Sequence, residues 1–359
     1  MPSQVFRDLL EIMKERGGPY AGLDIPEFYE LAETIFEPQE AEINNVLTRK
    51  PASVDEITTK TARDQQEVAA ILEAMARKGL CGIAKSGENV LYRGLPFMPG
   101  IFEFLFIGGG DGEWEKSVAG LIKAYKKAYT TAMGVEKIRF PLTRVITVAQ
   151  KIKFDNKIHT YDQVMTYIDK YEAIGIGACY CRQAAKLRNE DLHGMPVGVC
   201  MWFGEIAENI TEQLGGRRVS KEEAREIIAS CEEAGLIHMS RNTSEEIDFM
   251  CNCDRWHCEV VGNVLKQPKP GLVFNSGFMP TFDGDLCTAC GLCVERCPSG
   301  ALTEDAASRL AVNLDRCFGC GVCATGCPEG AIAMEAKADF PPPPKTTRDL
   351  VQALKNTAS

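Results

Sequence analysis

The 359-residue chain carries 40 Lys and Arg residues against 50 Asp and Glu residues, a formal net charge of −10 at pH 7. That balance disfavours a general nucleic-acid-binding protein, whose affinity depends on cations that displace counterions from phosphate, and attachment to an anionic membrane surface. The sequence has no apolar stretch of about 18 residues, the length that makes a membrane-spanning helix a candidate. The N-terminal segment lacks the apolar core and cleavage site of a signal peptide, so we expect a cytoplasmic protein of about two or three domains.

Residues 1–100 predict several helices followed by a β-hairpin. An amphipathic helix opens the chain and places four apolar residues on one face: Val5, Leu9, Ile12 and Met13. A short helix is expected over residues 54–61. Asp64 then caps a second helix, with Glu67 as its capping-box partner, and Gly79 ends it. The core-facing stripe of that second helix consists of Val68, Ile71, Leu72 and Met75.

Residues 81–94 complete this module as a hairpin, whose turn we expect at Ser86 and Gly87. The order of helix, turn, helix and hairpin resembles a winged helix–turn–helix, which implies either DNA binding or a structural, protein-contact role. The charges disfavour DNA binding, because the first 100 residues contain 11 Lys and Arg against 16 Asp and Glu. Two carboxylates, Asp64 and Glu67, also stand at the start of the helix that would enter the groove.

Residues 101–270 predict a mostly helical middle domain, since few of its runs are typical of strands. One helix is expected over residues 114–129. Capping boxes are expected at two further helix starts: Thr160 with Gln163, and Ser220 with Glu223. A third domain is expected over residues 281–335, and a proline-rich tail over residues 336–359. The sequence therefore predicts an α+β multidomain chain.

Sixteen cysteines are the most unusual feature of the sequence, because a reducing cytosol favours ligands or catalytic groups over disulfides. Half of them form two runs of the pattern C-x2-C-x2-C-x3-C-P. The first run consists of Cys287, Cys290, Cys293 and Cys297, and the second of Cys317, Cys320, Cys323 and Cys327. One C-x2-C pair could hold zinc, whereas two complete runs are typical of 4Fe–4S clusters. A 4Fe–4S cube needs four thiolates, and three at this spacing wrap one face, so the fourth sulfur comes from outside the loop.

The two runs resemble a bacterial-type ferredoxin with two 4Fe–4S clusters, which implies a pseudo-symmetric pair of short β-hairpins with two helices. In two-cluster ferredoxins the last cysteine of each run binds the other cluster. One ligand set is therefore implied to be Cys287, Cys290, Cys293 and Cys327, and the other Cys317, Cys320, Cys323 and Cys297. Three loop glycines are expected to allow close turns and to aim backbone N–H groups at sulfur: Gly291, Gly319 and Gly321.

Six further cysteines form a weaker pattern in the middle domain: Cys179, Cys181, Cys200, Cys251, Cys253 and Cys258. Three interpretations remain open, namely a third iron–sulfur cluster, a zinc site, or buried thiols. His193 and His257 are candidate nitrogen ligands. Six thiols exceed the four that one cube needs, so the sequence does not select a ligand set. Cys81 and Cys231 are expected to be core thiols.

The wider order resembles a family of multidomain ferredoxin-type proteins from anaerobes, with a winged-helix-like start, a C-x-C-R segment at 179–182, a C-N-C segment at 251–253 and two ferredoxin runs. The resemblance implies an electron-transfer component of a larger, often flavin-containing oxidoreductase rather than a stand-alone enzyme. The sequence has no phosphate-binding loop and no dinucleotide-binding glycine motif, so we expect no nucleotide or flavin on this chain. We predict a protein that passes single electrons through two 4Fe–4S clusters to or from a redox partner protein. The alternative hypothesis is a redox-sensing transcriptional regulator whose winged module binds DNA.

Overall fold

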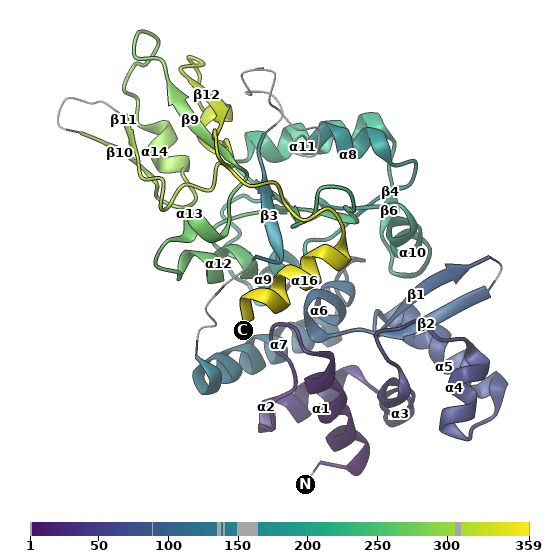
Figure 1. Ribbon diagram of the computed structural model, residues 1–359. Helices are drawn as coiled ribbons and strands as arrows, with labels where there is room; N and C mark the ends of the chain where they lie inside the picture. The colour runs from purple at the N-terminus through teal and green to yellow at the C-terminus, as the bar shows by residue number, and fades with distance from the viewer. Residues whose placement is uncertain are drawn as a thin grey trace. The chain divides into compact units, whose positions relative to one another are not determined.

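The computed structural model of the chain describes residues 2–87, 89–134, 138, 141–148, 164–305 and 310–358. It combines helices and short strands, in agreement with the predicted α+β class (Figure 1). The chain divides into two compact units. Unit 1 consists of Met1–Gly134, Gly177–Leu192 and Asn209–Arg217, and unit 2 of Val135–Ile176, His193–Glu208 and Arg218–Ser359. None of the described helices is long and apolar enough to span a bilayer.

Unit 1 begins with five helices and a hairpin: α1 Gln4–Arg16, α2 Pro26–Ile35, α3 Pro38–Val46, α4 Val54–Thr61, α5 Gln65–Lys78, β1 Cys81–Ser86 and β2 Asn89–Gly94. The predicted opening helix is confirmed, but its buried face is centred differently. Phe6 and Leu10 are buried beside Leu9 and Met13. Val5 and Ile12 are only half-buried and lie at the edge of that face.

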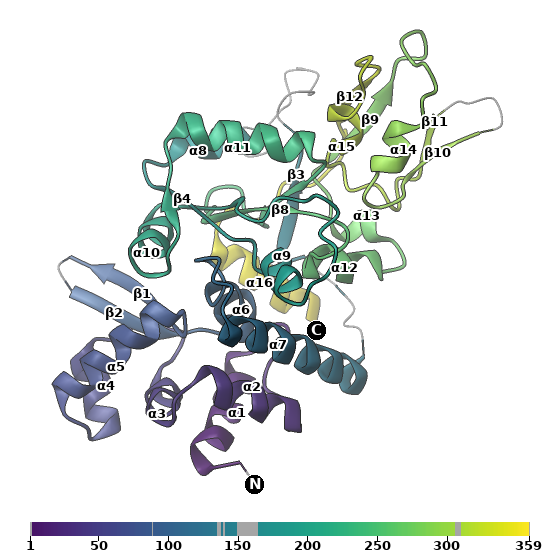
Figure 2. The same cartoon turned by 180° about the vertical axis from the view of Figure 1, so that it is seen from behind.

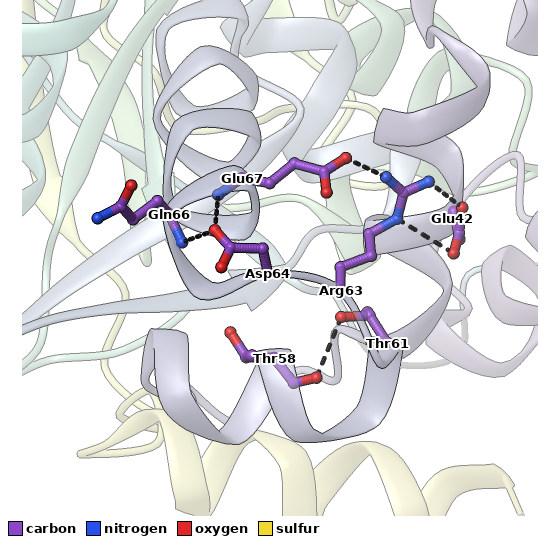
Figure 3. Close-up of polar contacts among 7 residues, drawn as sticks. All are labelled: Glu42, Thr58, Thr61, Arg63, Asp64, Gln66 and Glu67. Carbon is purple, nitrogen blue, oxygen red and sulfur yellow. Dashed lines mark hydrogen bonds and ion pairs between the residues drawn. The ribbon is translucent and has the colours of Figure 1, made fainter.

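The turn between α4 and α5 follows the local signals in the sequence (Figure 3). Helix α4 has the predicted bounds, and the Asp64 carboxylate accepts the backbone N–H groups of Gln66 and Glu67 at the start of α5. The predicted capping-box role of Glu67 is not seen, because its carboxylate binds the Arg63 guanidinium, which also binds Glu42. Gly79 ends α5 in the left-handed conformation, and all four residues of the predicted stripe are buried.

The hairpin of β1 and β2 pairs Ser86 with Asn89, so Ser86 belongs to β1 and the turn begins at Gly87, one residue later than predicted. Ala52, which lies just before α4, adds an antiparallel bridge to Tyr92 on the outer side of β2. From α3 onward the order in unit 1 is therefore helix α3, the bridging residue Ala52, helices α4 and α5, and the hairpin. The hairpin packs against α5, and α3 and α4 pack against the same helix.

The rest of unit 1 is an aromatic core around the predicted long helix, α7, which spans Glu113–Met133. A tight turn at Phe97–Ile101 and the short helix α6 at Phe102–Phe104 precede it. Phe97 stacks on Phe102 with ring centroids 4.9 Å apart, and Tyr125 of α7 packs edge-on against Phe97. Helix α9, Tyr180–Leu187, joins this core through Tyr180, whose ring lies 5.7 Å from that of Phe106.

A six-stranded sheet is the centre of unit 2, and the expectation of few strands in residues 101–270 is wrong. The order is β3-β7-β8-β5-β4-β6, with β3 Thr143–Ile146, β4 Ile174–Gly177, β5 Cys200–Phe203, β6 Arg217–Arg218, β7 Ile237–Arg241 and β8 Phe249–Cys253. The sequence does not reveal these strands because they are short, and because β4 and β5 are buried at every residue. A strand buried on both faces shows no alternation of apolar and polar residues.

The two faces of this sheet carry different layers. On one face α8, Val164–Lys170, and α11, Lys221–Glu233, lie side by side and bury Met201 and Met250 (Figure 2). On the other face Ile237 and Met239 pack in a core with α12, Glu259–Leu265, and the segment around α13, Pro270–Val273. Ser220 caps α11 by accepting the Glu223 N–H at 3.1 Å, which confirms the Ser220 half of the predicted capping box. Helix α10 spans Glu205–Gln213, and the capping box predicted at Thr160 and Gln163 lies outside the described residues.

The cysteine runs lie in the last part of unit 2, where two antiparallel strand pairs flank two short helices (Figure 1). The elements are β9 Phe278–Phe282, α14 Leu292–Arg296, β10 Leu302–Glu304, β11 Leu310–Val312, α15 Val322–Thr325 and β12 Ile332–Ala336. Strand β9 pairs with β12, and β10 pairs with β11. Helix α16, Thr347–Ala358, ends the described chain, and the Thr347 N–H donates to the Glu246 carboxylate at 2.7 Å.

Candidate iron–sulfur centres

Two cavities in residues 278–336 sort the eight cysteines of the runs into two groups of four. The first cavity, of about 360 Å³, is lined by Cys287, Cys290, Cys293 and Cys327. The second, of about 310 Å³, is lined by Cys297, Cys317, Cys320 and Cys323. Each cavity therefore receives three thiols from one run and the fourth thiol from the other run. The grouping coincides with the ligand sets that the ferredoxin resemblance implies.

Left-handed backbone residues in each run allow three thiols to turn toward one cavity. Gly319 and Gly321 have φ values of 67° and 81° in the second run, and Gly291 has 76° in the first. Ala289 takes the place of Gly319 in the first run and still adopts a φ of 52°. Each run then enters a short helix, α14 or α15, whose first turn carries the third cysteine. The predicted conformational role of the loop glycines is confirmed.

Backbone N–H groups point at several of these sulfur atoms. The Ala301 N–H donates to Cys297 Sγ at 3.2 Å. The Gly319 and Val322 N–H groups hydrogen-bond with the sulfurs of Cys317 and Cys320 and favour their ionised forms. Donors of this kind stabilise thiolates and bound clusters, so the loops fit the negative charge of an iron–sulfur group.

The two cavities differ in their exposure to water. All four thiols of the second cavity are buried, and burial raises the pKa values of Cys317, Cys320 and Cys323 above the ordinary thiol value. In the first cavity Cys290 is exposed. Buried thiols remain protonated unless a cation compensates their charge, so the second cavity needs a metal group to hold thiolates.

The set of thiols at each cavity suits a 4Fe–4S cluster. Each cavity presents four thiols, three from one run and one from the other, which is the donor set of the clusters in two-cluster ferredoxins. The donor set, the cavities and the N–H groups together fit a 4Fe–4S cluster at each place.

Residues 284–332 match the family model described as a 4Fe-4S dicluster domain. The match supports 4Fe–4S binding in this segment and an iron–sulfur electron-transfer role, which in general requires a redox partner. A comparison with curated proteins found no match for the chain. The family model covers only the cysteine runs and their immediate surroundings, and it leaves the N-terminal module and the middle cysteines unassigned.

Polar side chains that sequence reasoning missed hold the backbone around the second cavity in place. Asn275 Nδ2 donates to the Cys317 carbonyl at 2.7 Å, and Ser276 Oγ donates to the Gly319 carbonyl at 2.7 Å. Arg255 Nη1 donates to the Cys297 carbonyl at 3.1 Å. No motif in the sequence identifies these anchors, because each acts on backbone atoms more than 40 residues away.

The structure brings three of the six middle cysteines together. Cys251 and Cys253 lie on β8, Cys258 is the residue before α12, and the Cys253 thiol hydrogen-bonds with both other thiols. Those hydrogen bonds, together with burial, raise the pKa of Cys253 well above its ordinary value. Cys200 begins β5 in the same unit. In unit 1, Cys179 precedes α9 and Cys181 lies in its first turn.

The candidate histidine ligands make contacts with side chains of the loop between β8 and α12. His193 stacks on the exposed Trp256 ring with centroids 4.6 Å apart. The His257 Nδ1 atom lies 3.2 Å from the Asp254 carboxylate, which also accepts the Trp256 and His257 N–H groups. Asp254 therefore fixes the loop that returns the chain from β8 to Cys258. Cys81 and Cys231 are both buried, as expected for core thiols.

Proposed function

We propose that this chain is an electron-transfer protein that holds one 4Fe–4S cluster in each of the two cavities. The proposed ligands are Cys287, Cys290, Cys293 and Cys327 in the first cavity and Cys297, Cys317, Cys320 and Cys323 in the second. The observation that carries the proposal is the crossed grouping of thiols, three from one run and one from the other, around two cavities of similar size. When bound, such clusters supply single-electron transfer.

The surroundings of the first cavity support a docking role for that end of the protein. Cys290 is exposed, and the apolar side chains of Leu286 and Leu292 beside it are 49% and 41% exposed. Glu304 and Glu329 line the same cavity. An apolar patch with carboxylates at its edge suits a partner that presents a basic surface, with an association rate that falls as salt increases.

The partner is proposed to be a larger oxidoreductase of anaerobic metabolism, flavin-containing and cytoplasmic like this chain. The substrate chemistry then belongs to that partner, and the chain's own residues bind, insulate and position the clusters. A third iron–sulfur cluster or a zinc ion at the middle cysteines completes the proposal. Support for the partner comes from the acidic net charge and from the resemblance of most of the chain to multidomain ferredoxin-type proteins.

The ligand assignment is tested by replacing Cys320 with serine in the full chain and purifying the protein without oxygen. We expect the variant to contain about four fewer irons and four fewer acid-labile sulfides per chain than the unmodified protein. Cys81→Ser is the matched control, because Cys81 is also buried but lies outside the runs and donates to the Leu72 carbonyl. Unchanged iron content in Cys320→Ser would overturn the ligand assignment.

A DNA-binding regulator is the second candidate function. The order of α3, Ala52, α4, α5 and the hairpin supports a winged-helix arrangement. The charges oppose DNA binding, because the Arg63 guanidinium forms ion pairs with Glu42 and Glu67 (Figure 3). The Lys78 ammonium forms another ion pair with Glu40. A gel-shift experiment with genomic fragments at low salt tests this candidate, since low salt favours any affinity for phosphate. A reproducible shift would favour the regulator, and its absence would favour the electron carrier.

A further inference from the structure

Three thiols form a compact group on one face of the unit 2 sheet. Cys251 and Cys253 are two residues apart on β8 and therefore point to the same side of the strand. Cys258 reaches the same place from the start of α12, because the Asp254 carboxylate holds the intervening loop by accepting two backbone N–H groups. The Cys253 thiol contacts both partners, and none of the three forms a disulfide.

The neighbouring strand supplies a fourth thiol. Strand β5 pairs with β8 through Met201 opposite Met250 and Trp202 opposite Phe249. Continued by one residue, this register places Cys200 opposite Cys251. Directly opposed residues of an antiparallel pair point to the same face of the sheet. Four thiols from three elements of one unit therefore share this face.

The opposite face of strands β5 and β8 carries no cysteine. Met201 and Met250, which alternate with the cysteines along β5 and β8, pack with α8 and α11 in an ordinary apolar core. On the thiol face of the same two strands the side chains are Cys200, Cys251 and Cys253, although aliphatic side chains would pack there without introducing a reactive group. Thiolates in a buried place require a metal to compensate their charge.

The thiol face adjoins the second cavity. Cys253 and Cys258 belong to the same apolar core as Cys320, and Phe274 and Phe318 fill that core with their rings 5.2 Å apart. Arg255, in the loop between Cys253 and Cys258, donates to the backbone carbonyl of Cys297, which lines the second cavity. One packed core therefore joins the thiol face to the cavity.

We propose that Cys200, Cys251, Cys253 and Cys258 hold a third iron–sulfur cluster next to the second cavity, an inference that rests on the proposed electron-transfer function. A redox-active cluster is favoured over zinc, which has no redox chemistry, because the thiol face shares an apolar core with Cys320 of the second cavity. The position gives the chain a third redox group in contact with the core around the second.

The test compares Cys253→Ser, Cys81→Ser and the unmodified full chain, all purified without oxygen. Iron, acid-labile sulfide and zinc are measured per chain, and the dithionite-reduced samples are examined by electron paramagnetic resonance. We expect about twelve irons and no zinc in the unmodified chain, and about eight irons in Cys253→Ser with the signals of the two ferredoxin-type clusters retained. Cys81→Ser should keep all twelve.

The outcomes separate this inference from the proposed function. About eight irons in the unmodified chain, one zinc per chain, or full iron in Cys253→Ser would overturn the third cluster and leave the two-cluster proposal intact. Failure of the two-cluster proposal is detected by a separate measurement, because that failure predicts that the iron content of Cys320→Ser is unchanged. Retained ferredoxin-type signals report that unit 2 has folded. If Cys253→Ser does not fold, Cys251→Ser takes its place, because Cys251 is only half-buried, and the same loss of about four irons is expected.

Discussion

Alanine at Gly321 is expected to destabilise unit 2 by about 1–3 kcal/mol more than alanine at Gly291. The two glycines hold matching places in the two cysteine runs, with φ values of 81° and 76°. The backbone cost of alanine in the left-handed region, about 1–2 kcal/mol, is therefore the same at both positions. It is partly offset at both by about 0.4–1 kcal/mol, because alanine restricts the unfolded chain.

The surroundings of the two glycines create the difference. A Cβ atom at Gly321 would overlap Cγ2 of Val148, a fully buried and β-branched side chain that has little freedom to move aside. Overpacking of this kind costs about 1–3 kcal/mol. At Gly291 the nearest atom to a new Cβ is Glu304 Oε1 at 3.9 Å, which is an ordinary contact.

The assay is the thermal loss of iron–sulfur absorbance in the full chain without oxygen. A loss of 1 kcal/mol lowers the midpoint by about 2–4 °C for a unit of this size, so the Gly321→Ala midpoint should lie about 2–12 °C below that of Gly291→Ala. Adding Val148→Ala to Gly321→Ala removes the overlap, so the double variant should be more stable than the sum of the single losses predicts. Equal midpoints for the two alanine variants, or strictly additive losses in the double variant, would refute the reasoning.

Two further predictions concern unit 1. Asp64→Ala should cost about 1 kcal/mol, because α5 loses the acceptor of two backbone N–H groups, and Asp64→Asn should recover most of it in urea unfolding; equal losses in the two variants would contradict the capping role. The Arg188 guanidinium and the Lys123 ammonium lower the pKa of Glu190 to about 2. The contribution of ionised Glu190 to the stability of unit 1 is therefore fully present above about pH 4.5 and is lost as the pH falls toward 2. Glu190→Gln should therefore weaken hydrogen-exchange protection of α7 peptides at pH 7, and the gap from the unmodified chain should shrink at pH 3; a gap of the same size at both pH values would count against the ion pairs.

Local signals account for the parts of the fold that could be predicted from the sequence. The Asp64 cap, the Gly79 stop and the bounds of α4 depend on atoms within about four residues of one another, and the sequence displays such groups side by side. The ferredoxin runs belong to the same class, because three thiols of each run come from seven consecutive residues. The error at Glu67 has a physical cause as well, since Arg63 offers its carboxylate a charged partner that competes with a backbone N–H.

Long-range pairing accounts for most of what could not be predicted. Strand β3 pairs Thr143 with Arg241, almost a hundred residues later in the chain, and its four residues show no pattern that identifies the partner. The middle cysteines illustrate the consequence. The register between β5 and β8 decides that Cys200 is opposite Cys251, and a shift of one residue would turn the thiols to the other face of the sheet.

The two cysteine runs have the same spacing of cysteines, yet the chain gives them different surroundings. The second run is enclosed by the rest of unit 2, since Asn275 and Ser276 hold its carbonyls and the Val148 N–H donates to the Cys320 carbonyl at 3.2 Å. The first run leaves Cys290 exposed. Because exposure to solvent and hydrogen bonds to sulfur set the potential of an iron–sulfur cluster, equal ligand sets in the two cavities should have unequal potentials. The repeat in the sequence therefore determines which thiols group together, and the packing of non-repeated segments against one run makes the two proposed clusters chemically distinct.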